Sequence, residues 1–222
     1  SKLSGDEAGI VFTQLCNVLE PRDAVDFSSV SNELRELTQA LLQQLRAAHE
    51  LPTALCLKMG MQSCKELREA KLVDWHNKDL TATDLAFLGT LGSMLPALEM
   101  LVLYESSPTA TNHDGVLRLA AGLGAGALPA MTHLGLSMHV SDAGASALAA
   151  ALGRGAMPQL KKHALPNCGL SDTGLITLVP ALWARPGLVF LNFARNQIGD
   201  RSLAALVAPP PPPPADARTP PI

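Results

Sequence analysis

Histidines, cysteines and glycines are the residues of this sequence whose types could support chemistry. No two histidines have an H-x-x-x-H or similar spacing that would direct both rings to one metal ion, and no C-x-x-C pair offers a zinc or redox site. The side chains excluded in this way are His49, His76, His113, His133, His139, His163, Cys16, Cys56, Cys64 and Cys168. No serine, cysteine or lysine has the neighbours of an activated nucleophile. We therefore predict a non-enzymatic protein with no catalytic residue, no metal and no cofactor.

A glycine triplet, Gly122-x-Gly124-x-Gly126, could cradle a phosphate group in its backbone. Gly153 and Gly155 recur in the same context further along the chain. Glycines at such positions commonly end helices, because they adopt the left-handed conformation without steric cost. We interpret all of them as helix ends that turn the chain into the next strand.

Residues 131–198 contain a unit that occurs twice and then begins a third time. Each unit opens with an L-x-x-L-x-L-like hexad, passes a polar or cysteine position and an Asp-containing turn, and continues into a segment of helical periodicity. Leu134, His163 and Leu191 occupy the same place in successive units, at spacings of 29 and 28 residues. A fixed period of this size predicts a solenoid of stacked units.

Each unit is predicted to contain a strand, a turn and a helix. The alternating leucines of L-x-L point to one face of a short strand. Asn196 can hydrogen-bond the free backbone groups of the turn, and Cys168 takes its place one unit earlier. Asp142, Asp172 and Asp200 fall at helix starts, where a carboxylate meets free N–H groups and the positive end of the helix dipole. The expected buried helix stripes are Leu148 with Leu152, and Leu175 with Leu178 and Leu182.

This pattern resembles the leucine-rich-repeat family, in its long-repeat, ribonuclease-inhibitor-like class. The residues that carry the resemblance most completely are Leu188, Leu191, Phe193, Asn196, Ile198, Gly199 and Asp200. The resemblance implies an α/β solenoid, with short parallel strands on the concave face and helices on the convex face. It also implies protein binding, which is the use that most relatives make of this fold.

Residues 1–50 are predicted to form a separate, all-helical module. Apolar residues recur at helical spacing between Ile10 and Leu19, and Ser31 or Asn32 can cap a later helix. The stretch resembles an F-box at Phe12, Leu15, Leu19, Pro21, Arg22, Asp23, Val30 and Leu34. That resemblance implies contact with the adaptor of a cullin-type ubiquitin ligase. The alternative is a helical cap that covers the open end of the solenoid, which a repeat array requires in any case.

Residues 51–208 are predicted to form the solenoid, with its first strands at 55–57, 73–75 and 101–103. The spacing from Leu101 to Leu134 grows to 33 residues, and we assign the excess to a rim loop at 104–115. Residues 209–222 form a proline-rich tail. Its six consecutive prolines favour polyproline II, so we predict a stiff spacer, with a ligand for aromatic-grooved domains as the alternative.

The concave face is the predicted binding surface for a protein partner. On each strand, the residues between and after the leucines point to this face. Several of them are apolar, which is typical of an interface. The predicted partner-binding residues are Asp74, His76, Lys78, Met100, Val102, Tyr104, His133, Ser137, Lys162, Phe190 and Asn192.

Composition limits the partners and the compartment. A net charge of −3 and a pI near 6.0 give no electrostatic reason to expect nucleic acid or an anionic membrane. No run of 18 apolar residues could span a bilayer. The cysteine pattern favours reduced, buried thiols over disulfides. We therefore expect a cytoplasmic or nuclear substrate-recognition subunit of a cullin-type ligase. The alternative is a structural subunit of a large assembly, in an organelle after removal of a targeting peptide.

Overall fold

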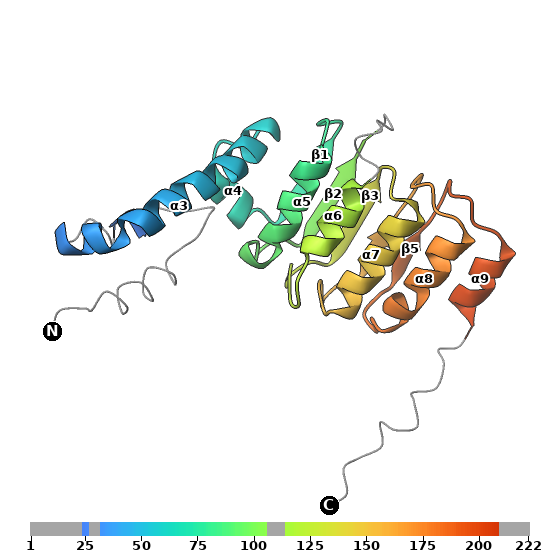
Figure 1. Cartoon of the computed structure of the whole chain (residues 1–222). Helices are drawn as coiled ribbons and strands as arrows, with labels where there is room; N and C mark the ends of the chain where they lie inside the picture. Colours follow the sequence, from blue (N-terminus) through green and yellow to red (C-terminus); the bar gives the residue numbers. More distant parts are fainter. Residues whose placement is uncertain (1–23, 27–31, 106–113, 209–222) are drawn as a thin grey trace, which may run out of the picture.

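The computed structural model describes residues 24–26, 32–105 and 114–208. A long helix, α3 (Asn32–Lys58), and a short one, α4 (Cys64–Glu69), precede five strands that alternate with helices. Figure 1 shows α3 extending away from the end of the molecule formed by β1 and α5. The strands are β1 (Leu72–His76), β2 (Met100–Tyr104), β3 (His133–Ser137), β4 (Lys162–Ala164) and β5 (Phe190–Asn192). The other helices are α5 (Ala82–Thr90), the 3-10 helix η1 (Leu91–Met94), α6 (Gly115–Gly122), α7 (Ser141–Gly153), α8 (Asp172–Trp183) and α9 (Asp200–Val207).

The strands form one parallel sheet in the order of the sequence, β1-β2-β3-β4-β5. Leu101 pairs with Leu134, Leu134 with His163, and His163 with Leu191, as the repeat spacing predicts. Val73 pairs with Leu101, so the same register extends back to β1. The predicted α/β class and the parallel strands are confirmed.

Helices α5 to α9 lie side by side on one face of the sheet (Figure 1). Their apolar stripes meet the inward side chains of the strands in one continuous core. The stripes predicted for α7 and α8 are buried, and Leu148, Leu175 and Leu178 are fully so. Every second strand residue enters this core and its neighbours face away, as the burial patterns of β1, β2 and β3 show.

The strand predicted at residues 55–57 is wrong, because these residues form the last turns of α3. Leu55 is 2% exposed whereas Leu57 is 64% exposed, so the two leucines do not share a face as they would on a strand. Cys56 and Met59 are buried beside Leu55, which is helical spacing. The helix ends at Lys58, and Gly60 follows it with a positive φ of 81° and backbone bonds that fit a left-handed cap.

The turns after the strands are held by polar side chains from the following unit. The predicted role of Asn196 is confirmed, since its Oδ1 accepts from the backbone N–H groups of Cys168 at 2.9 Å and Leu170 at 3.1 Å. The Cys168 thiol in turn donates to the carbonyl of Leu136 at 3.2 Å. At the other end of the sheet, the buried carboxylate of Glu105 accepts from the N–H groups of Lys78 and Leu80, both at 3.1 Å.

The prediction for the helix-start aspartates needs correction. Asp142 and Asp172 do lie in the first turns of α7 and α8. Their carboxylates, however, accept from the next unit: Asp142 accepts from the N–H of Ser171, and Asp172 from the N–H of Gly199 at 2.8 Å. The hydroxyl of Ser202 and the N–H of Gly199 both donate to Asp172 and hold its pKa below the usual value. Each carboxylate therefore links neighbouring helix starts.

Helix ends are held by arginines that the sequence analysis does not single out. Arg154 donates to the carbonyls of Ala120 and Leu123, both at 3.0 Å, at the end of α6. Arg185 donates to two carbonyls near the end of α7, at 2.6 and 2.8 Å. The glycine interpretation holds, because Gly122 and Gly153 end helices and Gly126 and Gly155 have positive φ.

Several predictions lie outside the described residues. They include the proline-rich tail, residues 106–113 of the rim loop predicted at 104–115, Cys16 and the F-box-like positions Phe12, Leu15, Leu19, Pro21, Arg22, Asp23 and Val30. The ends of that loop are wrong as predicted, because Tyr104 is the last residue of β2 and Gly115 is the first of α6. Leu34 lies in α3, which runs without a break across the predicted boundary between residues 50 and 51. Within the described part of the chain, no helix combines the length and apolarity needed to cross a membrane.

Candidate functional site

The face of the sheet opposite helices α5 to α9, here called the open face, carries the outward side chains of the strands. The strand register aligns these side chains in three rows across the sheet. The first row is Leu72, Met100, His133, Lys162 and Phe190. The middle row is Asp74, Val102, Gly135, Ala164 and Asn192. The third row begins with His76, Tyr104 and Ser137. The structure thus brings ten of the eleven predicted partner-binding residues onto one face.

The middle of the open face is hollowed, with a volume of about 480 Å³. Gly135 and Ala164 are small, and together with Val102 they give the hollow an apolar floor. A Cβ added at Gly135 would lie 3.5 Å from the side chain of Val102, which is ordinary contact, so packing does not demand a glycine there. The missing side chain creates the space above the strand.

One wall of the hollow comes from β1 and β2. The rings of His76 and Tyr104 lie 5.3 Å apart in a tilted arrangement. Nδ1 of His76 is 2.7 Å from a carboxylate oxygen of Asp74, and both side chains are exposed. The aspartate therefore orients the imidazole ring against the tyrosine, so this wall has a fixed aromatic surface.

The opposite wall comes from the turns that follow β4 and β5, and the sequence analysis missed it. Pro166, Asn167, Ala194 and Arg195 line it. Asn167 and Arg195 have positive φ values of 55° and 58°, which an asparagine tolerates more readily than an arginine. Register was an available signal for Pro166 and Ala194, which continue the outward positions of β4 and β5 past the strand ends. Asn167 and Arg195 fall at inward positions of that alternation and reach the hollow only through the path of the turns.

The first row lies beside the hollow, and its residues are exposed at β1, β4 and β5 and half-buried at β2 and β3. Lys162 and Phe190 are exposed partners in the register. Partial burial and the positive charges of Lys162 and Lys161 lower the pKa of His133, so its ring stays neutral at pH 7. Nδ1 of this ring is 2.7 Å from the hydroxyl of Thr132. The charge of this row thus comes from Lys162.

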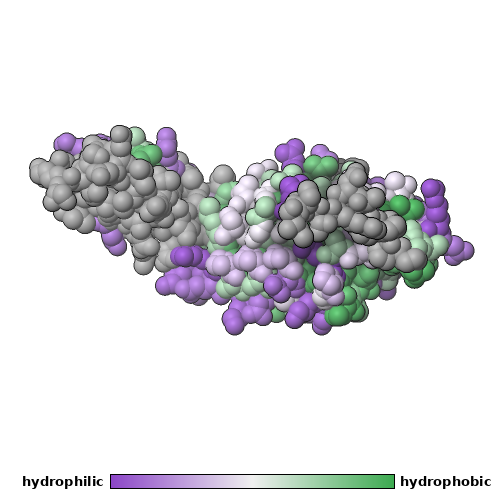
Figure 2. Space-filling view, turned by 90° about the horizontal axis from the view of Figure 1, so that it is seen from below, coloured by the Kyte–Doolittle hydropathy of each residue, from purple (hydrophilic) through white to green (hydrophobic). Residues whose placement is uncertain are grey.

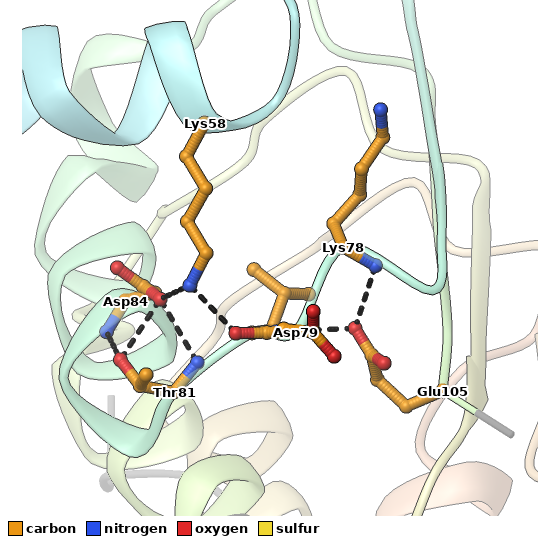
Figure 3. Close-up of polar contacts among 7 residues, drawn as sticks. Lys58, Lys78, Asp79, Thr81, Asp84 and Glu105 are labelled. Atoms are coloured by element: carbon orange, nitrogen blue, oxygen red, sulfur yellow. Dashed lines mark hydrogen bonds and ion pairs between the residues drawn. The ribbon is translucent and has the colours of Figure 1, made fainter. Parts of the chain in front are cut away.

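Lys78 does not join the hollow. Figure 3 shows its side chain directed away from Glu105, which accepts instead from its backbone N–H. The same view shows a second polar cluster, in which Nζ of Lys58 is 2.6 Å from both the carbonyl of Asp79 and the carboxylate of Asp84. Thr81 completes a capping box with Asp84 at the start of α5. These contacts join α3 to the first strand–helix unit and are structural.

Reactive cysteines and metal-binding clusters are two further kinds of site that this sequence could hold. Cys56, Cys64 and Cys168 are free and buried, and burial raises the pKa of both Cys56 and Cys168 to about 12. In the ranges 24–26, 32–105 and 114–208, no group of three His, Cys, Asp or Glu side chains could hold a metal ion.

Comparison of the sequence with protein-family models and with curated proteins gives no match.

Proposed function

We propose that this protein is a non-enzymatic protein-interaction module whose hollow on the open face binds a segment of another protein. The observation that carries the proposal is the hollow itself, which has a volume of about 480 Å³, an apolar floor and polar side chains along its border. Binding pockets commonly combine a mainly apolar lining with a few polar groups that fix orientation. The architecture behind it is proposed to be a leucine-rich-repeat solenoid, supported by the constant register across five parallel strands.

Within this proposal, the specific role is substrate recognition for a cullin-type ubiquitin ligase. The F-box-like segment would hold the ligase adaptor and the open face would hold the target. The support is positional, because α3 leaves the sheet at its β1 end, far from β5 (Figure 1). A protein bound near α3 would leave the hollow accessible.

A second candidate is a structural subunit of a large assembly, and one observation favours it. Exposed apolar residues gather at the end of the molecule formed by β5 and α9, where green side chains appear at the right of Figure 2. Val189 is 78% exposed and Val207 is 83% exposed, with Phe190 and Leu203 about half exposed. An apolar end of this kind is suited to permanent contact with a neighbouring subunit.

The test is quantitative co-purification of the full chain and two variants from cells. Gly135→Val fills the hollow, with Gly124→Val as the matched control at an open surface glycine. Val207→Asp disrupts the apolar end formed by β5 and α9. Loss of partners only with Gly135→Val supports binding in the hollow, and recovery of a cullin and its adaptor supports the ligase role. Loss only with Val207→Asp supports the structural subunit and contradicts the first proposal.

A further inference from the structure

The polar groups around the hollow are mainly hydrogen-bond donors. Ser137, Asn167 and Arg195 line it from β3 and from the turns after β4 and β5, and Tyr104 adds its hydroxyl. Their side chains have no hydrogen-bond or ion-pair partner among the residues that the structure describes. An amide and a hydroxyl both donate and accept, whereas the guanidinium of Arg195 offers five N–H donors and no acceptor, so donors outnumber acceptors here. The hollow therefore suits a ligand rich in acceptor oxygens.

The charged side chains of the β3, β4 and β5 strands and of the turns that line the hollow are cations, and the carboxylates that follow, Asp142, Asp172 and Asp200, lie in the first turns of helices. Residues 131–141, 159–171 and 186–199 hold Lys161, Lys162 and Arg195 and no carboxylate. On the side of β1 and β2, by contrast, Asp74 contacts His76 and Lys71 contacts Glu99. The whole chain has a net charge of −3, so the excess of cations on this surface is local.

The cations lie at both ends of the strands. Lys162 pairs with Phe190 at the beginning of β5, whereas Arg195 follows the end of that strand. The apolar floor of Val102, Gly135 and Ala164 lies between these two levels. An extended peptide that crosses the floor would pass a cation on either side of its central residue.

We propose that the hollow binds an acidic segment of a partner protein, with an apolar side chain on the floor and a carboxylate on Arg195. This inference rests on the proposed function and names the chemistry of the partner. Carboxylates form strong, often bidentate hydrogen bonds with arginine, which explains why an unpaired guanidinium beside an apolar floor selects such a segment. A nucleic acid would supply anions too, but the floor offers no stack of aromatic rings for its bases.

The experiment is selection of random displayed peptides on the purified full chain, with counter-selection on Gly135→Val. Selected peptides are then synthesised with each Asp or Glu changed to Asn or Gln, and dissociation constants are measured by fluorescence anisotropy at low and high salt. We expect enrichment of Asp or Glu next to Leu, Phe, Tyr or Trp. We also expect Arg195→Asn to weaken binding of the selected peptides about tenfold. When the peptide already carries Asn or Gln in place of its acidic residue, Arg195→Asn should weaken binding no further, because both changes remove the same contact.

Asparagine is chosen at position 195 because it tolerates the positive φ there. Arg118→Gln on α6 is the control for loss of a charge, and Gly124→Val is the control for an added side chain; both should bind as the original chain does. The inference of an acidic partner would be overturned by selected peptides that lack acidic residues, or by an Arg195→Asn variant with unchanged affinity. The proposed function would still stand in either case. If no peptide depends on Gly135, both fall. An oligonucleotide that binds more tightly than every peptide, and loses affinity with Arg195→Asn, would overturn the inference in favour of nucleic acid.

Discussion

The unit of β3 and α7 and the unit of β5 and α9 have the same sequence pattern but differ in burial. Leu134 and Leu136 of β3 are buried, and so are Leu148 and Leu152 of α7. In β5, Leu191 is half-buried, and α9 buries only Ser202. The first unit has a neighbour on each side and the second has one, on the side of β4, within the described residues. The pattern therefore specifies a strand and a helix, whereas burial depends on neighbours.

The two units also differ in how their turns are held. In the turn after β4, two backbone N–H groups donate hydrogen bonds to Oδ1 of Asn196 in the next unit. The helix start of α8 is likewise tied to α9 through Asp172. In the described part of the chain no further unit follows α9 to hold the turn after β5 in this way. Stability should therefore decline toward β5 and α9.

The largest effect should come from a charge placed in the inner unit. Leu134→Asp buries an unpaired carboxylate and should cost about 3–5 kcal/mol of the free energy of unfolding. Leu191→Asp should cost roughly 1 kcal/mol, because the half-buried side chain can remain partly hydrated. Urea unfolding followed by circular dichroism measures both. Equal losses would contradict the difference in burial between the two units.

A smaller effect should follow from removing a tie between units. Asn196→Ala leaves the N–H groups of Cys168 and Leu170 and the carbonyl of Leu165 without their partner, which should cost about 2–3 kcal/mol. Asn192→Ala is the matched control, since it loses one hydrogen bond to Ala194 on the exposed side and should cost about 0.5 kcal/mol or less. Hydrogen exchange should show the loss of protection in the turn after β4. Protection lost only within β5 would contradict the tie.

The sequence was sufficient for the repeated part of the fold because two periods reinforce each other there. Strand register from β1 to β5 and the helix stripes follow from leucine spacing alone. The strand predicted at residues 55–57 was wrong because the spacing of Leu55 and Leu57 fits a strand and a helix equally well. Pro52 lies inside α3 and does not end it. The role of Glu105 was not predicted, because the long spacing between Leu101 and Leu134 placed this residue in a rim loop rather than in a turn contact.

The candidate site was predicted in outline and missed in detail. Alternation places side chains on the open face, which is why the three rows could be expected. The hollow depends on the absence of a side chain at Gly135, and its donors depend on the path of two turns. Neither has a periodic signal. Arg195 therefore became visible only when the turns after β4 and β5 were placed beside each other.

A substitution in β4 should raise the free energy of unfolding, because it replaces a buried polar ring with an apolar side chain. His163 is fully buried in register with Leu134 and Leu191, and neither ring nitrogen makes a well-formed hydrogen bond within the described residues. His163→Leu should raise the free energy of unfolding by about 1–2 kcal/mol. Thermal and urea unfolding measure the change, and His76→Gln on the exposed face is the control. A destabilised leucine variant would show that the ring has an unseen partner.

The same histidine should make stability depend on pH. Burial lowers the pKa of His163 to about 4, with the Leu134 backbone opposing the shift in part, whereas an unfolded histidine titrates near 6.5. Between these values the unfolded chain binds more protons, so stability should fall by about 1 kcal/mol per unit as pH drops from 6.5 toward 4. Carboxylates titrate in the same range, so the quantity to measure is the difference between the original chain and His163→Leu. A difference that stays constant with pH would contradict a buried, neutral ring.

The smallest effect should be found at the other end of the molecule, where α3 meets the first strand–helix unit through an ion pair. Lys58→Ala removes a 2.6 Å contact to Asp84, but both side chains are partly exposed, so the loss should be under about 1 kcal/mol. Burial tends to raise the pKa of Asp84, and hydrogen bonds from Lys58 and Thr81 outweigh it, so the net pKa is lowered. The stabilisation should therefore be present above the ordinary aspartate pKa of about 4 and be lost as pH falls below it.

The matched control for this ion pair is Lys65→Ala, which breaks an exposed 3.8 Å contact to Glu69 within α4. Urea unfolding at low and high salt should show a salt-dependent loss for Lys58→Ala and a smaller one for the control, because screening weakens exposed pairs. If Lys58→Ala instead costs more than Asn196→Ala, the β1 end of the sheet depends on its helix more than the β5 end depends on its neighbours. Stability would then decline from β3 toward both ends, and the inner units would be the only part of the sheet held independently of its ends.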